Sequence, residues 1–216
     1  MTESIAPFVD RTMPLRKLTE FAQQASLSNG AIVALTGMAG CGKSVLLQRF
    51  VEYVNSTSGD HYEVMVGRCI DSDAMPYLPF VDAMRRYFNV TGFDPASTTR
   101  KIKEMLFDIS KDLLNLLPVI GPLLSVGVTV AQHSQHFSGA PEFDQNYQFY
   151  AVAQVLSQIS KKKKIILVIE DIHWADRSTL HLLQYLAEEL RKSPVLIIVT
   201  YRPQPIGKEM YYITRL

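Results

Sequence analysis

The sequence predicts an α/β domain in which a parallel β-sheet is sandwiched by helices. Short apolar runs recur along the chain, and segments with the helical spacing of apolar residues separate them. In addition, a glycine-rich turn joins the first apolar run to the helical segment that follows it. Strands that alternate with helices in this way form parallel sheets with right-handed crossovers.

The first half of the chain predicts two strands and three helices. Apolar residues at helical spacing favour a helix over residues 12–27, which a Ser-Asn-Gly sequence ends. Ala31–Thr36 is a continuous apolar run, as expected for a parallel strand that is covered on both faces. A helix over about residues 43–54 follows the glycine-rich turn. Residues 62–69 form a second strand candidate, and a helix over residues 76–88 has a proline near its first turn.

The second half predicts two more strands. Residues 97–117 have a helical pattern and lead into an apolar insertion. A Ser-Gly-Ala-Pro turn then precedes a helix over about residues 144–160. Lys164–Ile169 is an apolar strand that ends in acidic residues. A helix over residues 177–192 and a strand over residues 195–200 complete the pattern of a parallel sheet.

The apolar insertion requires a comparison with membrane spans. Leu113–Ala131 carries no charged side chain and is long enough to cross a bilayer. However, two prolines and two glycines interrupt it, and basic flanking residues are missing. The sequence therefore favours a buried or partner-facing insertion over a membrane span.

Composition excludes several classes of protein. The chain has 216 residues, of which 47% are hydrophobic and 20% charged, an ordinary balance for one globular domain. The formal net charge of +1 provides no general attraction for nucleic acid or an anionic membrane. Cys41 and Cys69 lack metal-ligand spacing and are too few for a disulfide framework. With no signal peptide visible, we expect reduced thiols in a cytoplasmic protein.

The glycine-rich turn is the strongest motif. It matches G-x-x-x-x-G-K-[ST], the phosphate-binding P-loop, without a mismatch. Glycines let backbone N–H groups turn toward phosphate oxygens, and the following helix adds its positive N-terminal end. Lys43 can reach the β- and γ-phosphates, and the Ser44 hydroxyl can join the Mg²⁺ shell. The predicted nucleotide-binding residues of this turn are Gly37, Met38, Ala39, Gly40, Cys41, Gly42, Lys43, Ser44 and Val45.

The third strand ends in a second candidate site. One carboxylate of Glu170 and Asp171 can hold Mg²⁺, and the other can orient or deprotonate an attacking water. We slightly favour Glu170 as the metal ligand and Asp171 as the water-orienting group. Arg202 follows the fourth strand, where it is either a sensor of the γ-phosphate or a solvated loop arginine. His173 is either a packed polar residue or a sensor on the γ-phosphate side.

Other residues near these motifs favour structural interpretations. Cys41 is a redox-regulated thiol or, more simply, a small side chain that fits the turn. Trp174 favours packing over base stacking. Asp176 is placed to cap the helix that begins near residue 177. The four lysines of residues 161–164 favour contact with a helix C-terminal end and with solvent over nucleic-acid binding.

Taken in order, these motifs resemble the N-terminal ATPase module of STAND- and AAA-type signalling proteins. That family includes large LuxR-type regulators and ATPases associated with adenylyl cyclases. The resemblance implies ATP and ADP as ligands, Mg²⁺, slow hydrolysis and a nucleotide-driven switch. It also suggests adenine-side contacts for Arg11, although Asp10 and Thr12 replace the glycine and glutamate usual there. Its further supports are Phe8-Val9-Asp10-Arg11, Gly67-Arg68-Cys69, Pro76–Phe80, Leu167–Asp176 and Thr200–Pro203.

We therefore expect a helical lead-in over residues 1–29 and a P-loop ATPase core over residues 30–216, with an apolar helical insertion at about 97–140. The core is expected to end before the lid and output domains of the family. The expected function is Mg-ATP binding and slow hydrolysis as a switch module. Its partners would be nucleotide and other domains or protomers of a larger assembly. A nucleotide-binding module without hydrolysis and a small-molecule phosphotransferase are the alternatives.

Overall fold

A four-stranded parallel sheet forms the centre of the computed structural model, which describes residues 12–25, 29–57, 61–70, 76–90, 95–129 and 144–203. The strand order is β1-β4-β3-β2, and every neighbouring pair is parallel. The predicted P-loop α/β fold class, with its parallel sheet, is confirmed. The strands are β1 (Ala31–Thr36), β2 (Tyr62–Arg68), β3 (Lys164–Glu170) and β4 (Val195–Tyr201).

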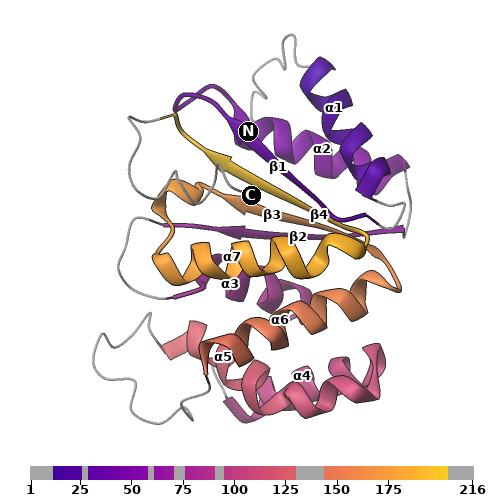
Figure 1. Cartoon of the computed structure of the whole chain (residues 1–216), viewed down its shortest axis with the longest axis vertical. Coiled ribbons are helices and arrows are strands. Elements are labelled where there is room, and N and C mark those ends of the chain that lie inside the picture. Colours follow the sequence, from indigo (N-terminus) through magenta and orange to yellow (C-terminus); the bar gives the residue numbers. More distant parts are fainter. Residues whose placement is uncertain are drawn as a thin grey trace, which may run out of the picture.

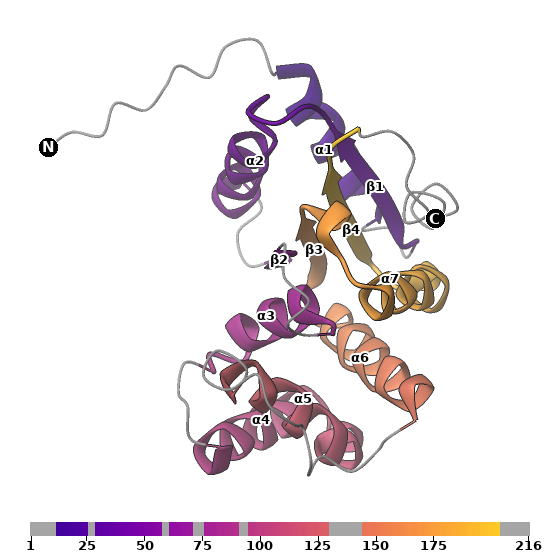
Figure 2. The ribbon, with the colours of Figure 1, turned by 90° about the vertical axis from the view of Figure 1, so that its left-hand side faces the viewer.

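Helices cover both faces of the sheet, as predicted. Figure 2 shows α1 and α2 on one side of the strands and α3, α6 and α7 on the other, which gives three layers. Figure 1 shows α6 and α7 on the side of the strands opposite α1 and α2. The helices are α1 (Thr12–Ala25), α2 (Lys43–Thr57), α3 (Leu78–Tyr87), α6 (Gln145–Ser160) and α7 (Arg177–Glu189), and the short 3-10 helices η3 (Ile172–Trp174) and η4 (Leu190–Lys192) flank α7.

The two central strands, β3 and β4, hold the layers together. Ile166 and Ile198 face α1 and α2, in the smaller core cluster, which also contains the completely buried Phe50. Alternate residues such as Leu167 and Ile197 face the opposite, larger cluster. Because a strand presents successive side chains to opposite faces, a strand buried on both faces reads as a continuous apolar run. The predictions for these two strands are therefore confirmed.

The prediction that β1 is covered on both faces is wrong. Ala34 and Thr36 are exposed, and the other residues of β1 are half-buried. Among the strands that the structure describes, β1 lies at the edge of the sheet and pairs with β4 alone. An apolar run predicts a strand in a parallel sheet but does not distinguish a central strand from an edge strand.

The insertion between β2 and β3 forms a separate layer. It consists of α4 (Pro95–Ile109), the 3-10 helix η2 (Lys111–Leu116) and α5 (Leu117–Thr129). These helices lie beyond α3 and α6, on the side away from the sheet (Figure 2). Ile102 of α4 and Leu124 of α5 are completely buried there.

The helical pattern predicted for residues 97–117 is interrupted. Ser110 has an extended backbone, with φ −163° and ψ 136°, and its hydroxyl accepts a hydrogen bond from the N–H of Asp112. A serine in this conformation caps a new helix rather than continuing the old one. Of the helices in the described parts of the chain, none is both long and apolar enough to cross a membrane. The apolar stretch thus lies mainly in η2 and α5, and residues 130–131 fall outside the described residues.

Candidate functional site

The loop between β1 and α2 lies at the carboxyl end of the sheet. Gly40 and Gly42 have φ angles of 72° and 83°, which residues with a side chain rarely adopt. A Cβ atom added to Gly37 would lie 2.6 Å from the sulfur of Cys41, so the Cys41 side chain would have to move to admit it. A Cβ atom at Gly40 would meet nothing within 4 Å. The loop therefore leaves space beside its backbone, as phosphate binding requires.

Lys43 is directed back over this loop. Its Nζ donates hydrogen bonds to the carbonyl oxygens of Gly37, at 2.7 Å, and Met38, at 3.1 Å. The residue is only 9% exposed. Its ammonium group thus lies within the turn of the loop, while Met38 and Val45 remain exposed.

Ser44 and Glu170 meet across the site. The Ser44 hydroxyl donates a hydrogen bond of 2.8 Å to Oε2 of Glu170, although 126 positions separate the two residues. A hydroxyl and a carboxylate oxygen are suitable ligands for Mg²⁺, which also uses phosphate and water oxygens. Within the described ranges, no group of three or more His, Cys, Asp or Glu side chains forms a metal cage. The arrangement fits a metal that arrives with a nucleotide rather than an all-protein site.

Asp171 is held through both its backbone and its side chain. Its backbone is left-handed, with φ 55° and ψ 44°, and its N–H donates to the hydroxyl of buried Thr200 at 2.9 Å. Arg68 donates to Oδ2 of Asp171 from Nε, at 3.1 Å, and from Nη2, at 2.9 Å. The sequence singled out Arg68 only as part of a family motif and missed this ion pair. The pairing depends on the register of β2 and β3, in which Arg68 lies opposite Glu170.

His173 is the middle residue of η3, two positions after Asp171. Burial lowers the pKa of His173 from its usual value of 6.5; the charge of Asp171 raises this pKa, whereas Arg202 and Lys43 lower it. The ring contacts that of Trp174, with centroids 5.2 Å apart. Trp174 itself is 40% exposed, so its packing is only partial. The half-buried Arg202 follows β4 directly, and its charge acts on the same histidine.

The two cysteines differ in their surroundings. Cys41 is partly exposed in the loop, 4.0 Å from Nζ of Lys43. Cys69 is buried, and this burial raises the pKa of its thiol to about 12, with smaller contributions from Asp176 and Asp171. Cys69 therefore stays a protonated, unreactive thiol at neutral pH.

Two structural interpretations from the sequence are confirmed. Asp176 caps α7, because its carboxylate accepts hydrogen bonds from the N–H and the hydroxyl of Thr179. The lysines of residues 161–164 contact α6, α4 and β2 rather than forming a separate basic surface. Arg11, the proposed adenine-side residue, lies outside the described residues.

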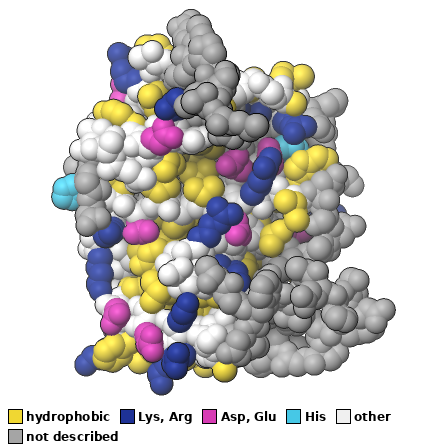
Figure 3. Space-filling model, turned by 180° about the vertical axis from the view of Figure 1, so that it is seen from behind, with side chains coloured by type: hydrophobic (Ala, Val, Ile, Leu, Met, Phe, Trp, Pro, Cys, Tyr) yellow, Lys and Arg dark blue, Asp and Glu magenta, His cyan; other side chains and the backbone are white. Residues whose placement is uncertain are grey.

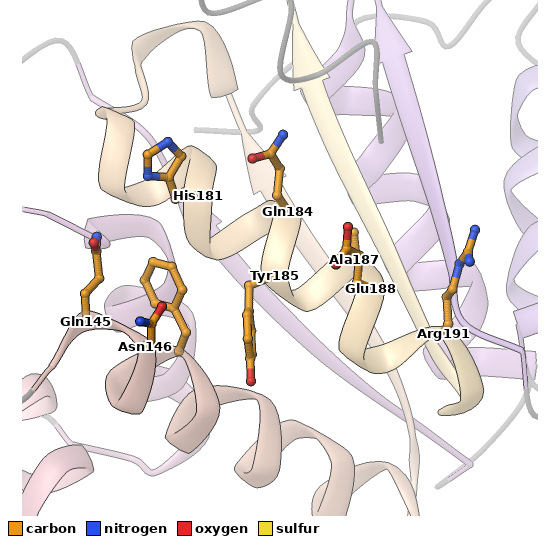
Figure 4. Close-up of a pocket in the computed structure, with 9 residues that line it drawn as sticks. Gln145, Asn146, His181, Gln184, Tyr185, Ala187, Glu188 and Arg191 are labelled. Atoms are coloured by element: carbon orange, nitrogen blue, oxygen red, sulfur yellow. The ribbon is translucent and has the colours of Figure 1, made fainter.

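The surface has no large region of one charge on the face that Figure 3 shows, where basic and acidic side chains are interspersed. A pocket of about 700 Å³ lies between α6 and α7 (Figure 4). Its lining is mostly polar and includes neither the loop at 37–44 nor the acidic turn after β3. The lining residues are Gln145, Asn146, Phe149, His181, Gln184, Tyr185, Ala187, Glu188 and Arg191.

A match to a family model agrees with this geometry. Residues 7–198 match the family model described as an AAA ATPase domain. The chain is 21% identical over 198 residues to an uncharacterized protein of Rhizobium meliloti (strain 1021), a match that covers 91% of this chain and 19% of that protein. The chain thus spans about a fifth of the length of this relative. Among solved structures, it is similar to C. elegans PCH-2, with a TM-score of 0.42, 11% identity, and coverage of 91% of this chain and 39% of the other.

Proposed function

Since this chain belongs to the AAA ATPase domain family, which binds nucleotides, we propose that it binds Mg-ATP between the loop at 37–44 and the acidic turn after β3. We further propose that it hydrolyses ATP slowly and acts as a nucleotide-dependent switch within a larger protein. The observation that carries this proposal is the contact between Ser44 and Glu170 at 2.8 Å. It brings together the two motifs that a Mg-nucleotide site requires.

Each group of residues in the proposed site has its own role in binding or hydrolysis. Backbone N–H groups of residues 37–44 and the ammonium group of Lys43 bind the phosphates. Ser44 and Glu170 would hold Mg²⁺, and a metal bound there would supply neutralisation of the charge on the phosphates. The Asp171 carboxylate orients the attacking water and accepts its proton. Arg202, at the end of β4, contacts the γ-phosphate.

The switch rests on a difference between ATP and ADP. Arg202 follows β4, whose end also contacts the loop and the acidic turn, so the presence of a γ-phosphate would change the position of this strand end. The proposed domain organisation is a helical lead-in before residue 30 followed by the ATPase core. The match to only 19% of a longer relative supports a place for this domain within a larger protein. The signal and the output would then come from the rest of such a protein.

Nucleotide binding is tested by replacing the lysine of the loop. We expect Lys43→Ala, and Lys43→Met with its longer apolar stem, to weaken ATP and ADP binding about a hundredfold, because charged hydrogen bonds to the phosphates are lost. Isothermal titration calorimetry measures both affinities. Lys161→Ala, which removes a similar charge from the end of α6, is the matched control and leaves them unchanged. Equal affinities in the wild type and both Lys43 variants would refute the proposal.

A single-turnover experiment separates the three functions. Release of inorganic phosphate from bound ATP indicates an ATPase, and its loss in Asp171→Asn with retained binding supports the proposed role of that residue. Unchanged bound ATP indicates a binding module, and a phosphorylated small molecule in place of phosphate indicates a phosphotransferase.

A further inference from the structure

The imidazole of His173 is the starting point. Both of its ring nitrogens are buried, and neither has a hydrogen-bond partner among the described residues. A buried polar atom without a partner costs about 1–3 kcal/mol, and such atoms are rare in native proteins. An unpartnered histidine therefore needs an explanation other than packing.

The position of the ring suggests what it contacts. Ile172, the preceding residue, is completely buried and anchors η3 against the larger core. The charged groups that act on His173 are Asp171, Arg202 and Lys43. These three residues come from the acidic turn, the end of β4 and the phosphate-binding loop. The ring thus lies within electrostatic reach of all three parts of the proposed site.

The chemistry of the ring fits an anion in this place. Burial and the neighbouring cations keep the imidazole neutral at pH 7, so that one nitrogen is a donor and the other an acceptor. A neutral donor beside Lys43 and Arg202 adds a directed hydrogen bond without adding repulsion between cations.

We propose that His173, together with Arg202, lets this domain distinguish ATP from ADP. On ATP binding its ring turns toward the loop and donates a hydrogen bond to an oxygen of the γ-phosphate. ADP leaves the same nitrogen without a partner. The inference rests on the proposed function, since it places the triphosphate between the loop and the acidic turn.

The main experiment compares two ligands and two variants. Calorimetry in the presence of Mg²⁺ gives the Kd of ADP and of an ATP analogue with a β,γ-imido bridge. For His173→Phe we expect about a tenfold loss of affinity for the analogue, the effect of one hydrogen bond to a charged group, and no change for ADP. His173→Gln retains a donor and should lose less. His61→Phe, at an exposed position before β2 and therefore at the opposite end of the sheet, is the matched control and should change neither affinity.

Two further measurements keep the test independent of folding and activity. Without nucleotide, His173→Phe should be at least as stable as the wild type in urea, because the unpartnered polar atoms are removed. In the wild type, the ¹⁵N chemical shifts of the His173 ring should change on addition of the analogue and not of ADP.

The inference is overturned if His173→Phe lowers the affinities for both ligands equally, or if it lowers neither affinity. It is also overturned if the ¹⁵N chemical shifts of the ring respond equally to both ligands. In each of these cases, ADP binding that depends on Lys43 would leave the proposed function intact. Loss of the proposed function itself would appear as wild-type protein that binds neither ligand.

Discussion

The Asp171 carboxylate is fixed from two directions, by its own backbone and by a neighbouring strand. The left-handed backbone is held by the hydrogen bond to Thr200, and Arg68 donates twice to a single carboxylate oxygen. The Arg68 side chain is 62% exposed, whereas that of Asp171 is 13% exposed. Such a pair contributes little to stability, so its effect should appear in the position of the carboxylate.

We expect Arg68→Met to lower the single-turnover rate of ATP hydrolysis about tenfold. Without Arg68 the Asp171 carboxylate is no longer held in the position from which it orients the attacking water. Nucleotide affinity should not change, since Arg68 is not placed on the phosphates. Arg68→Lys should restore part of the rate, as a lysine provides one point of charge instead of two directed donors. Rapid quench with radiolabelled ATP measures the rate.

Arg86→Met is the matched control for this experiment. Arg86 forms an exposed ion pair with Asp82 on α3, at the same distance of 2.9 Å, but away from the site. A rate that falls equally in both variants would contradict a positioning role for Arg68.

The sequence predicted candidate residues only where the groups that act together are close together in the chain. The loop at 37–44 and the acidic strand end are contiguous motifs, and the cap at Asp176 needs only its neighbour Thr179. The partner of Asp171 could not be predicted, because it depends on β2 lying next to β3 in one register. The unpartnered state of His173 is likewise a property of the packed molecule.

At the scale of elements, β2 and α3 approach each other unusually closely. A Cβ atom on Gly67 would lie 1.8 Å from the carbonyl oxygen of Pro79. This approach explains two motifs that the sequence showed without a role, Gly67-Arg68-Cys69 and Pro76–Phe80. Tyr77, just before α3, contacts α7 and α6, since its N–H donates to Thr179 and its hydroxyl accepts from Gln145. A glycine is thus required where strand and helix meet.

We expect Gly67→Ala to destabilise the domain by about 2–3 kcal/mol, because backbone atoms must move to admit the methyl group. Gly121→Ala is the same substitution in α5, where the nearest atoms lie 3.8–4.0 Å away. At this position the higher helix propensity of alanine should stabilise the domain by about 0.5–1 kcal/mol. Urea unfolding followed by circular dichroism measures both changes. Similar changes of the same sign in the free energies of unfolding would show that the close approach of β2 and α3 does not require a glycine at position 67.

The elements were largely predictable because their apolar patterns are strong. The strand at 164–169 and the helix at 144–160 agree with β3 and α6 to within one residue at each end. The break at Ser110 was missed, because apolar residues keep a helical spacing on both sides of it. The half-exposed β1 was missed since strand order is not encoded in the hydrophobicity of a single strand.

At the scale of the whole molecule, the sheet joins two cores of unequal size. The smaller cluster lies under α1 and α2, and the larger one extends through α3, α6 and α7 to the insertion. β3 and β4 contribute to both clusters. Asp171 follows β3 directly, and His173 lies two residues further on. Unfolding of the sheet in denaturant should therefore also disrupt the site.

The pH dependence of this stability tests the burial of His173. Burial lowers the pKa of His173 in the folded protein. The negative charge of Asp171 raises this pKa, whereas the positive charges of Arg202 and Lys43 lower it further. Below about pH 6.5 the unfolded chain binds a proton that the folded protein binds less readily, so acidification reduces stability. Urea midpoints at pH 7.5 and 5.5, without nucleotide, should differ more for the wild type than for His173→Phe. An equal decrease in both proteins would show that the folded ring titrates normally.

The end of β4 supports both halves of the site. The N–H of Gly37 donates to the carbonyl oxygen of Tyr201, at 3.4 Å, and the N–H of Asp171 donates to Thr200 one residue earlier. A small shift of this strand end would therefore tilt the loop and the acidic turn together, and pulling on the backbone just beyond Arg202 would act on both at once. Mechanical tension on this segment and nucleotide occupancy are thereby coupled: force would alter affinity, and binding would resist force.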